Sequence, residues 1–200
     1  MRWFFDMNNP VMRTLSTLAD IVVLNLLTLV CSLPILTAGA ALTALNDACI
    51  RLVRMEDGEL ARDYFRAFKA NFKKATLLWL LFLAAALLVW FDYLAALSYV
   101  PQMRVAVLAV ALILLAVAFY TFALLARYEN RLWTTLQNAV KLAVGFFPRT
   151  LVMLVFAVAF WLACIRWFGF GSLFLLLAGL ALPVYLNAVL LNGVFEKIEK

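Results

Sequence analysis

Two long stretches of this chain carry no charged side chain. Residues 75–91 form an uncharged run of seventeen positions, and residues 105–126 form one of twenty-two. A helix needs about 20 apolar residues to cross the roughly 30 Å hydrocarbon core of a bilayer, because each residue adds about 1.5 Å. Since 68% of the whole chain is hydrophobic, a water-soluble domain is excluded, and the sequence predicts an all-α, polytopic membrane protein.

Six apolar segments are long enough to be spans, so we expect a helical bundle of six spans in a single membrane-embedded domain over residues 1–200. The segments are 15–33, 35–53, 75–98, 104–126, 149–167 and 170–192. Pro34 lies between the first two segments, and Gly39 lies near the start of the second. Proline lacks a backbone amide and glycine tolerates a tight reversal, so a bend is expected there. Two alternatives stay open: residues 15–53 form a hairpin of two spans, or they form one kinked element in a bundle of five spans.

The basic residues predict which side of the membrane each loop occupies. With the N-terminus in the cytoplasm and six spans, all but two of the seventeen Lys and Arg residues lie on the cytoplasmic side, and the exceptions are Arg104 and Arg166. An excess of Lys and Arg marks cytoplasmic loops. We therefore expect both termini in the cytoplasm. The net charge of +6 reflects this orientation, and no nucleic-acid partner is expected.

The two long loops on the cytoplasmic side predict amphipathic helices. Apolar residues recur at helical spacing in the first loop at Leu60, Tyr64, Phe65, Phe68 and Phe72, and more weakly in the second at Leu132, Leu136, Ala139, Val140, Ala143 and Val144. Such a helix can lie at the headgroup level with its cations toward anionic lipid, or it can dock on a partner protein. The expected lipid or partner surface consists of Tyr64, Phe65, Phe68, Lys69, Phe72 and Lys73.

Polar side chains inside the predicted spans are the candidates for function, because an Asp at mid-bilayer costs about 2.5–3.5 kcal/mol on insertion scales. The candidate polar cluster consists of Asp20, Asn25, Asn46, Asp47, Arg51, Asn187 and Asn192. Asp47 and Arg51 are four residues apart, so they can neutralise each other on one helix face. Two interpretations stay open: these groups hydrogen-bond helices together, or they line a path for a substrate or an ion.

Residues with the pattern of a catalytic or metal site are absent from the sequence. The chain has no histidine, which removes the commonest general base and metal ligand. Cys31, Cys49 and Cys164 lie in apolar runs without metal-ligand spacing, where a thiol behaves as a small hydrophobe. We therefore predict that the protein is not an enzyme and holds no catalytic residues, cofactor or metal.

A dense set of short motifs over residues 1–80 points to a known family. The motifs are Phe4-Phe5-Asp6, Asn9-Pro10, Leu18-Ala19-Asp20, Leu24-Asn25-Leu26-Leu27, Cys31-Ser32-Leu33-Pro34-Ile35, Thr37-Ala38-Gly39-Ala40, Leu42-Thr43-Ala44-Leu45, Arg51-Leu52-Val53-Arg54, Phe65-Arg66-Ala67-Phe68-Lys69-Ala70-Asn71-Phe72-Lys73-Lys74-Ala75-Thr76 and Trp79-Leu80. In these motifs the chain resembles the YesL-like family of bacterial integral membrane proteins, whose biochemical function is uncharacterised.

The resemblance implies a setting rather than an activity. Members of this family tend to be encoded in Gram-positive bacteria beside ABC-type sugar importers, solute-binding proteins and two-component sensors. The resemblance therefore implies a multi-pass protein of the bacterial plasma membrane. The leading hypothesis is a non-enzymatic accessory or scaffold subunit of a carbohydrate ABC importer, with the importer's permease subunits and membrane lipids as partners. The alternatives are a small solute transporter and a membrane regulator of a sugar-sensing two-component system.

Overall fold

The computed structural model describes residues 10–56, 58–98, 101–166 and 178–198, and it is helical nearly throughout these ranges. The elements are α1 (Pro10–Ser32), η2 (Ile35–Thr37), α2 (Ala38–Arg54), α3 (Leu60–Ser98), η3 (Pro101–Met103), α4 (Arg104–Arg127), α5 (Leu132–Gly145), α6 (Phe147–Arg166) and α8 (Ala181–Ile198). No strand occurs in the described ranges. The all-α prediction is therefore confirmed for this part of the chain.

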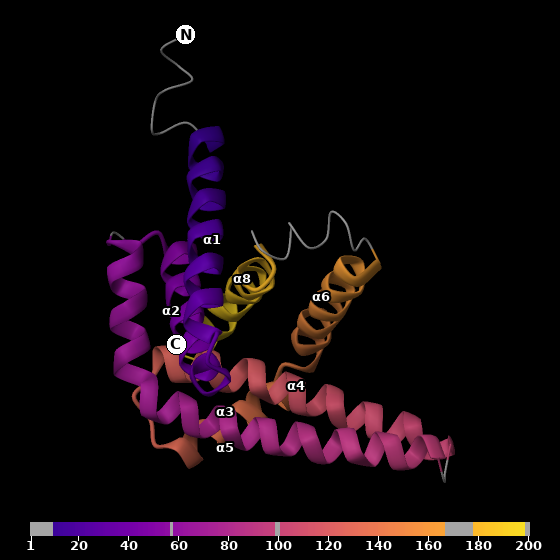
Figure 1. Ribbon diagram of the computed structural model, residues 1–200. Coiled ribbons are helices and arrows are strands. Elements are labelled where there is room, and N and C mark those ends of the chain that lie inside the picture. Colours follow the sequence, from indigo (N-terminus) through magenta and orange to yellow (C-terminus); the bar gives the residue numbers. More distant parts are fainter. Residues whose placement is uncertain (1–9, 57, 99–100, 167–177, 199–200) are drawn as a thin grey trace.

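Helices α1 and α2 form a hairpin (Figure 1). The reversal between them is closed by Thr37, whose Oγ1 hydroxyl lies 2.6 Å from the carbonyl oxygen of Cys31 and 2.8 Å from that of Pro34. Pro34 itself has no amide to continue α1. Of the two alternatives for residues 15–53, the structure has the hairpin of two helices.

Helix α2 is the centre of the fold and contacts α1, α3, α4 and α8. Its buried positions are mostly small residues, which let neighbouring helices approach closely. Gly39 marks the tightest approach: a Cβ atom there would lie 2.6 Å from the carbonyl oxygen of Ala75 in α3 and would collide with the side chain of Trp79. At Gly39 the α2–α3 contact is therefore too close to admit even a methyl group.

Helix α3 joins two predicted segments in one element. It begins in the predicted amphipathic loop and continues without a break through the predicted span at 75–98. No proline or glycine occurs between Leu60 and Ser98, so nothing in the sequence ends the helix at the membrane entry. At 39 residues its contour length is about 58 Å, nearly twice the thickness of a hydrocarbon core.

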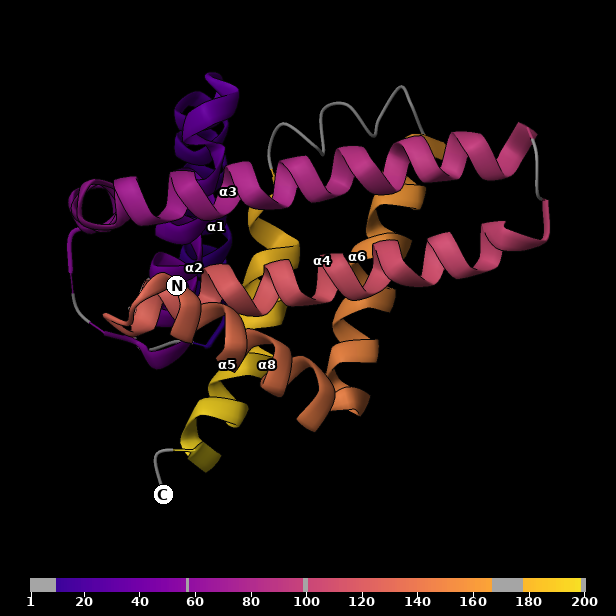
Figure 2. The ribbon, with the colours of Figure 1, turned by 90° about the horizontal axis from the view of Figure 1, so that it is seen from below.

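The long arm of α3 pairs with α4 as a hairpin that runs across the molecule, whereas α1 stands at a steep angle to it (Figures 1 and 2). The first turns of α3 run beside α2 instead (Figure 1). The α1–α2 hairpin and the α3–α4 hairpin thus cross at a steep angle. Helix α2 connects the two hairpins, since it contacts its partner α1 as well as α3 and α4.

Helices α5 and α6 meet at a sharp corner of 95°. Helix α5 packs against α4, and its buried residues are Thr135, Ala139 and Ala143. At the corner, the hydroxyl of Thr150 lies 3.0 Å from the carbonyl oxygen of Ala143 and 3.1 Å from the hydroxyl of Tyr120 on α4. These contacts attach the corner to α4.

Four of the described helical segments are long and apolar enough to cross a membrane: Thr14–Ser32, Ile35–Arg54, Leu60–Ala96 and Arg104–Arg127. The α5–α6 pair is a fifth if the bent pair is one span. The predicted span at 149–167 corresponds to α6. The predicted span at 170–192 begins outside the described residues, and its described apolar helix, Ala181–Leu191, is shorter than the other spans. The coarse prediction of a multi-pass membrane protein is therefore confirmed.

Candidate functional site

The residues of the predicted polar cluster lie in separate environments. Asn25 is fully buried in α1, and its Oδ1 accepts hydrogen bonds from the backbone amides of Leu180 and Ala181 at 2.8 and 3.0 Å. The first amides of a helix have no partner within the helix, so a side-chain oxygen there completes its first turn. Asn25 thus joins α1 to the start of α8, in agreement with the interpretation that these polar groups hold helices together.

The two other buried amides of the predicted cluster make different contacts. The Nδ2 of Asn46 donates to the carbonyl oxygen of Leu42 in its own helix at 2.8 Å. Asn187 in α8 is 3% exposed, and its Nδ2 has no hydrogen-bond partner. Asp20 lies half-buried on α1, and the side chain of Asn192 lies outside the described residues. Among these groups the structure pairs Asp47 with Arg51.

A chain of charges connects the end of α2 to the first turn of α3. The Nε of Arg51 donates to Asp47 at 2.9 Å, and its Nη1 lies 3.9 Å from Asp63. Asp63 is also paired with Arg66, at 3.1 Å. Sequence reasoning found Asp47 and Arg51 but missed Asp63 and Arg66, although their separation by three residues is a usual spacing for an ion pair on a helix.

A polar cavity of about 440 Å³ lies beside this chain of charges, where α2 and α4 both end. Its lining residues are Asp47, Ile50, Arg51, Arg54, Glu56, Ala126, Arg127 and Tyr128. The Nε of Arg127 donates to the hydroxyl of Tyr128 at 3.2 Å, and its guanidinium lies 5.6 Å from the centre of that ring. Sequence reasoning missed Arg54, Glu56, Arg127 and Tyr128, because the closeness of the two helix ends has no local signal.

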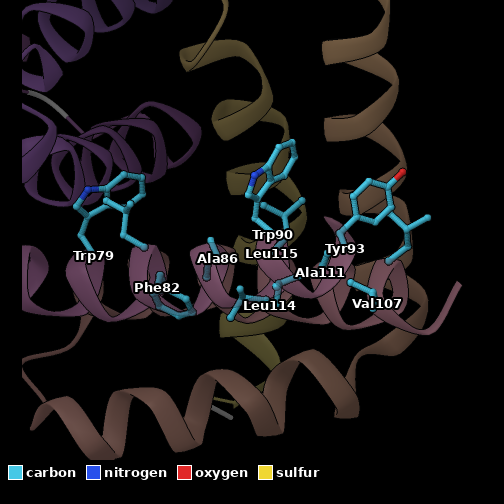
Figure 3. A pocket seen from close by; sticks show the side chains of 13 residues that line it. Trp79, Phe82, Ala86, Trp90, Tyr93, Val107, Ala111, Leu114 and Leu115 are labelled. Atoms are coloured by element: carbon cyan, nitrogen blue, oxygen red, sulfur yellow. The ribbon is translucent and has the colours of Figure 1, made fainter. Parts of the chain in front are cut away.

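An apolar groove of about 420 Å³ runs between α3 and α4, and residues of these two helices alone line it. Figure 3 shows Trp79, Trp90 and Tyr93 following one another along the groove, with Ala86 and Ala111 among its other lining residues. The indole Nε1 of Trp79 donates a hydrogen bond to the carbonyl oxygen of Ile35 at 2.8 Å, whereas Trp90 is 58% exposed. This arrangement is typical of a surface that accepts an apolar partner or lipid rather than of a catalytic cleft.

The predicted lipid or partner surface on the first part of α3 is divided between two faces. Tyr64 does not belong to the surface: its side chain is fully buried, with its hydroxyl 3.3 Å from the carbonyl oxygen of Ala41. Phe68 is half-buried and packs against the core. The remaining four residues are exposed, and they are Phe65, Lys69, Phe72 and Lys73.

In the described residues, no three His, Cys, Asp or Glu side chains are placed so that they could hold a metal ion together. Cys49 is buried among core residues, and Cys31 is half-buried at the end of α1. The side chain of Cys164 lies outside the described residues.

In comparisons with known proteins, no curated protein and no solved structure matches the chain. A family model does match, over residues 21–93. These residues comprise the second half of α1, all of α2 and most of α3, and so include the chain of charges and one wall of the apolar groove. YesL-like proteins belong to the matched family. Residues 21–93 match the family described as "Protein of unknown function, DUF624".

Proposed function

We propose that this protein is a non-enzymatic accessory or scaffold subunit of a carbohydrate ABC importer in the bacterial plasma membrane. The observation that supports this proposal best is the α3–α4 hairpin with its apolar groove. The groove is lined by two helices of the hairpin, and both helices also expose large apolar side chains to their surroundings. A helix of a membrane-embedded permease subunit would pack against this apolar surface.

The residues of the groove suit contact with a helix. Inside a bilayer, helices associate by close packing, because lipid tails are as apolar as the side chains. Ala86, Ala111 and Ala118 provide the small side chains that permit a close approach, and Trp79 and Trp90 provide large flanking surfaces. The resemblance to the YesL-like family is the reason for proposing an importer as the partner. The shape and the residues of the groove are the reason for proposing it as the docking position.

We propose six spans with both termini in the cytoplasm as the topology of this subunit. The asymmetry of the basic residues supports it, with all but two of seventeen on one side. Single cysteines at Ala38, Glu59 and Gln102 test it by labelling in intact cells with a membrane-impermeant reagent. We expect the cysteines at positions 38 and 102 to be labelled and the cysteine at position 59 to stay unlabelled. The opposite pattern would exclude the proposed topology.

Site-specific photo-crosslinking tests the docking position. A photoreactive amino acid in place of Trp90 should crosslink to permease subunits in native membranes, since Trp90 lies in the groove and is 58% exposed. Phe156 on α6 is a matched control, because it is a similarly exposed aromatic residue outside the groove. Crosslinks from position 90 to abundant unrelated proteins alone, or equal yields from 90 and 156, would contradict the proposal.

A small solute transporter is the second candidate. Two observations favour it: the polar cavity of about 440 Å³ and the buried Asn187 amide without a partner. A cavity of this size is within the usual range for small-molecule sites. In that case the purified protein in liposomes moves a solute, and Asp47→Ala stops the flux. If the Asp47→Ala variant kept full flux, the polar cavity would be excluded as part of the transport path.

A further inference from the structure

The first part of α3, residues 60–74, turns one face of the helix away from the rest of the protein. Six exposed side chains lie within about 120° of the helix circumference, since successive residues are about 100° apart. They are Arg62, Phe65, Arg66, Lys69, Phe72 and Lys73, and we call this set the aromatic–basic face. Cations beside exposed aromatic rings are typical of a helix that contacts a membrane surface.

The opposite side of the helix fixes the direction of this face. Tyr64 is fully buried, with its hydroxyl 3.3 Å from the carbonyl oxygen of Ala41 in α2, and Phe68 packs against the core. The ring centre of Phe65 lies 5.7 Å from that of Tyr64. The ring centre of Phe72 lies 5.6 Å from that of Phe68. Packing on the inner side therefore keeps both exposed rings on the outer face.

The two lysines of the face supply charge that is available to an anionic partner. Both arginines of the face have a carboxylate partner three residues earlier, at 3.7 and 3.1 Å. Lys69 and Lys73, by contrast, take part in no ion pair among the residues that the structure describes. They are four residues apart and so lie on one side of the helix. The charge of the face is therefore complementary to an anionic surface.

The continuation of α3 indicates that this anionic surface is a lipid membrane. The exposed side chains after Lys73 soon become apolar, at Leu77 and Leu80, within the uncharged run of residues 75–91. Lys73 and Lys69 lie about 3 and 9 Å before that run. The headgroup layer on each side of a bilayer is about 5–8 Å deep. A lysine side chain extends toward the polar layer from a nearby helix position, so both ammonium groups can reach the headgroups.

We propose that the aromatic–basic face binds the headgroups of anionic phospholipids. Lys69 and Lys73 contact the phosphates, and Phe72 packs against the adjoining part of the acyl chains. The ammonium groups gain a negative partner, whereas the phenylalanine ring leaves water. This surface shares no residue with the apolar groove, and the proposal does not depend on whether the protein serves an importer.

Photo-crosslinking to lipids tests the face in the full chain. The chain, with benzoylphenylalanine in place of Phe72, is reconstituted in nanodiscs of equimolar phosphatidylcholine and phosphatidylglycerol, and mass spectrometry identifies the lipid in each adduct. We expect several-fold more adducts with phosphatidylglycerol than with phosphatidylcholine. Phe156 is the matched control position, because it is an exposed phenylalanine within an uncharged part of α6. The two lipids should react there in equal amounts.

Variants of the two lysines make the test specific. Lys69→Gln/Lys73→Gln should lower the ratio of phosphatidylglycerol to phosphatidylcholine adducts by about fivefold or more, because each cation near an anionic membrane is worth roughly that factor. Lys69→Arg/Lys73→Arg keeps both charges and should keep the preference. Lys141→Gln removes a charge at an exposed position on α5 and should leave the ratio at position 72 unchanged.

Three results would overturn the proposal. One is a phosphatidylglycerol share at position 72 that equals the share at position 156. Another is a preference that Lys69→Gln/Lys73→Gln leaves unchanged. The third comes from native membranes: adducts of position 72 with a protein instead of with phospholipid would assign the aromatic–basic face to a protein partner.

Discussion

The indole Nε1 of Trp79 donates a hydrogen bond to the backbone carbonyl of Ile35 at 2.8 Å. This contact joins α3 to the turn between α1 and α2, across 44 residues of sequence. The ring of Trp79 also lies 6.2 Å from that of Phe122 on α4. One side chain therefore connects the α1–α2 hairpin to both helices of the apolar groove.

Replacing Trp79 with Phe should lower the free energy of unfolding by about 0.5–1.5 kcal/mol, because the carbonyl of Ile35 loses its donor. Thermal unfolding in detergent micelles measures the change. Trp90→Phe is the control, since Trp90 is 58% exposed and should change stability by less. Equal losses from the two substitutions would contradict an anchoring role for Trp79.

Gly39→Ala should destabilise the protein, because the added Cβ would meet the backbone oxygen of Ala75 and the side chain of Trp79. Forcing extra atoms into a packed contact costs about 1–3 kcal/mol. Gly145→Ala is a matched control, since a Cβ at Gly145 meets no atom within 4 Å. It should be neutral or slightly stabilising, because alanine has the higher helix propensity. A Tm for Gly39→Ala equal to that of Gly145→Ala would show that α2 and α3 are less closely packed than described.

Asn25→Ala should cost about 1–3 kcal/mol, because it leaves the buried amides at the start of α8 without their acceptor. Asn71→Ala is the control, because the amide of Asn71 only donates back to the carbonyl of Ala67 in its own helix. Hydrogen exchange locates the effect: the amides of Leu180 and Ala181 should exchange faster in Asn25→Ala alone. Unchanged exchange at these two positions would contradict the assignment.

Asp63→Asn should lower stability by about 1 kcal/mol or less in low salt, because Asp63 faces both Arg51 and Arg66 across a partly screened surface. The loss should shrink as salt is added, since ions screen such pairs. Glu59→Gln serves as the control: Glu59 pairs with Arg62 at 3.7 Å, and both side chains are mostly exposed. A difference between the two variants that does not depend on salt would rule out the charge explanation.

The sequence predicted the helices best where the physical signal was local. The uncharged run at 105–126 predicted α4 nearly residue for residue, because a long apolar helix is the stable form of such a run in lipid. The break at Pro34 was likewise visible, since proline cannot continue the hydrogen-bond ladder. The corner between α5 and α6 also had a signal, in Gly145 and Pro148, but its angle depends on the contact between Tyr120 and Thr150.

The candidate sites were harder to predict, because they depend on contacts between distant segments. Aromatic residues occur on two faces of the first part of α3, and periodicity alone does not say which face is covered. The structure buries Tyr64 against α2 and leaves Phe65 and Phe72 exposed. The polar cavity depends on the meeting of α2 and α4, whose ends are more than 70 residues apart in sequence.

The contact between Asn25 and the start of α8 has a consequence for biosynthesis. The donors to Asn25 follow it by 155 and 156 residues, so the ribosome must make all of this intervening chain before they emerge. Until then the Oδ1 of Asn25 lacks these two hydrogen bonds, and losing hydrogen bonds to a buried amide is costly in lipid. Helix α1 can therefore reach its final state only after α8 has been made, and a truncation that removes α8 should perturb the surroundings of Asn25 in α1.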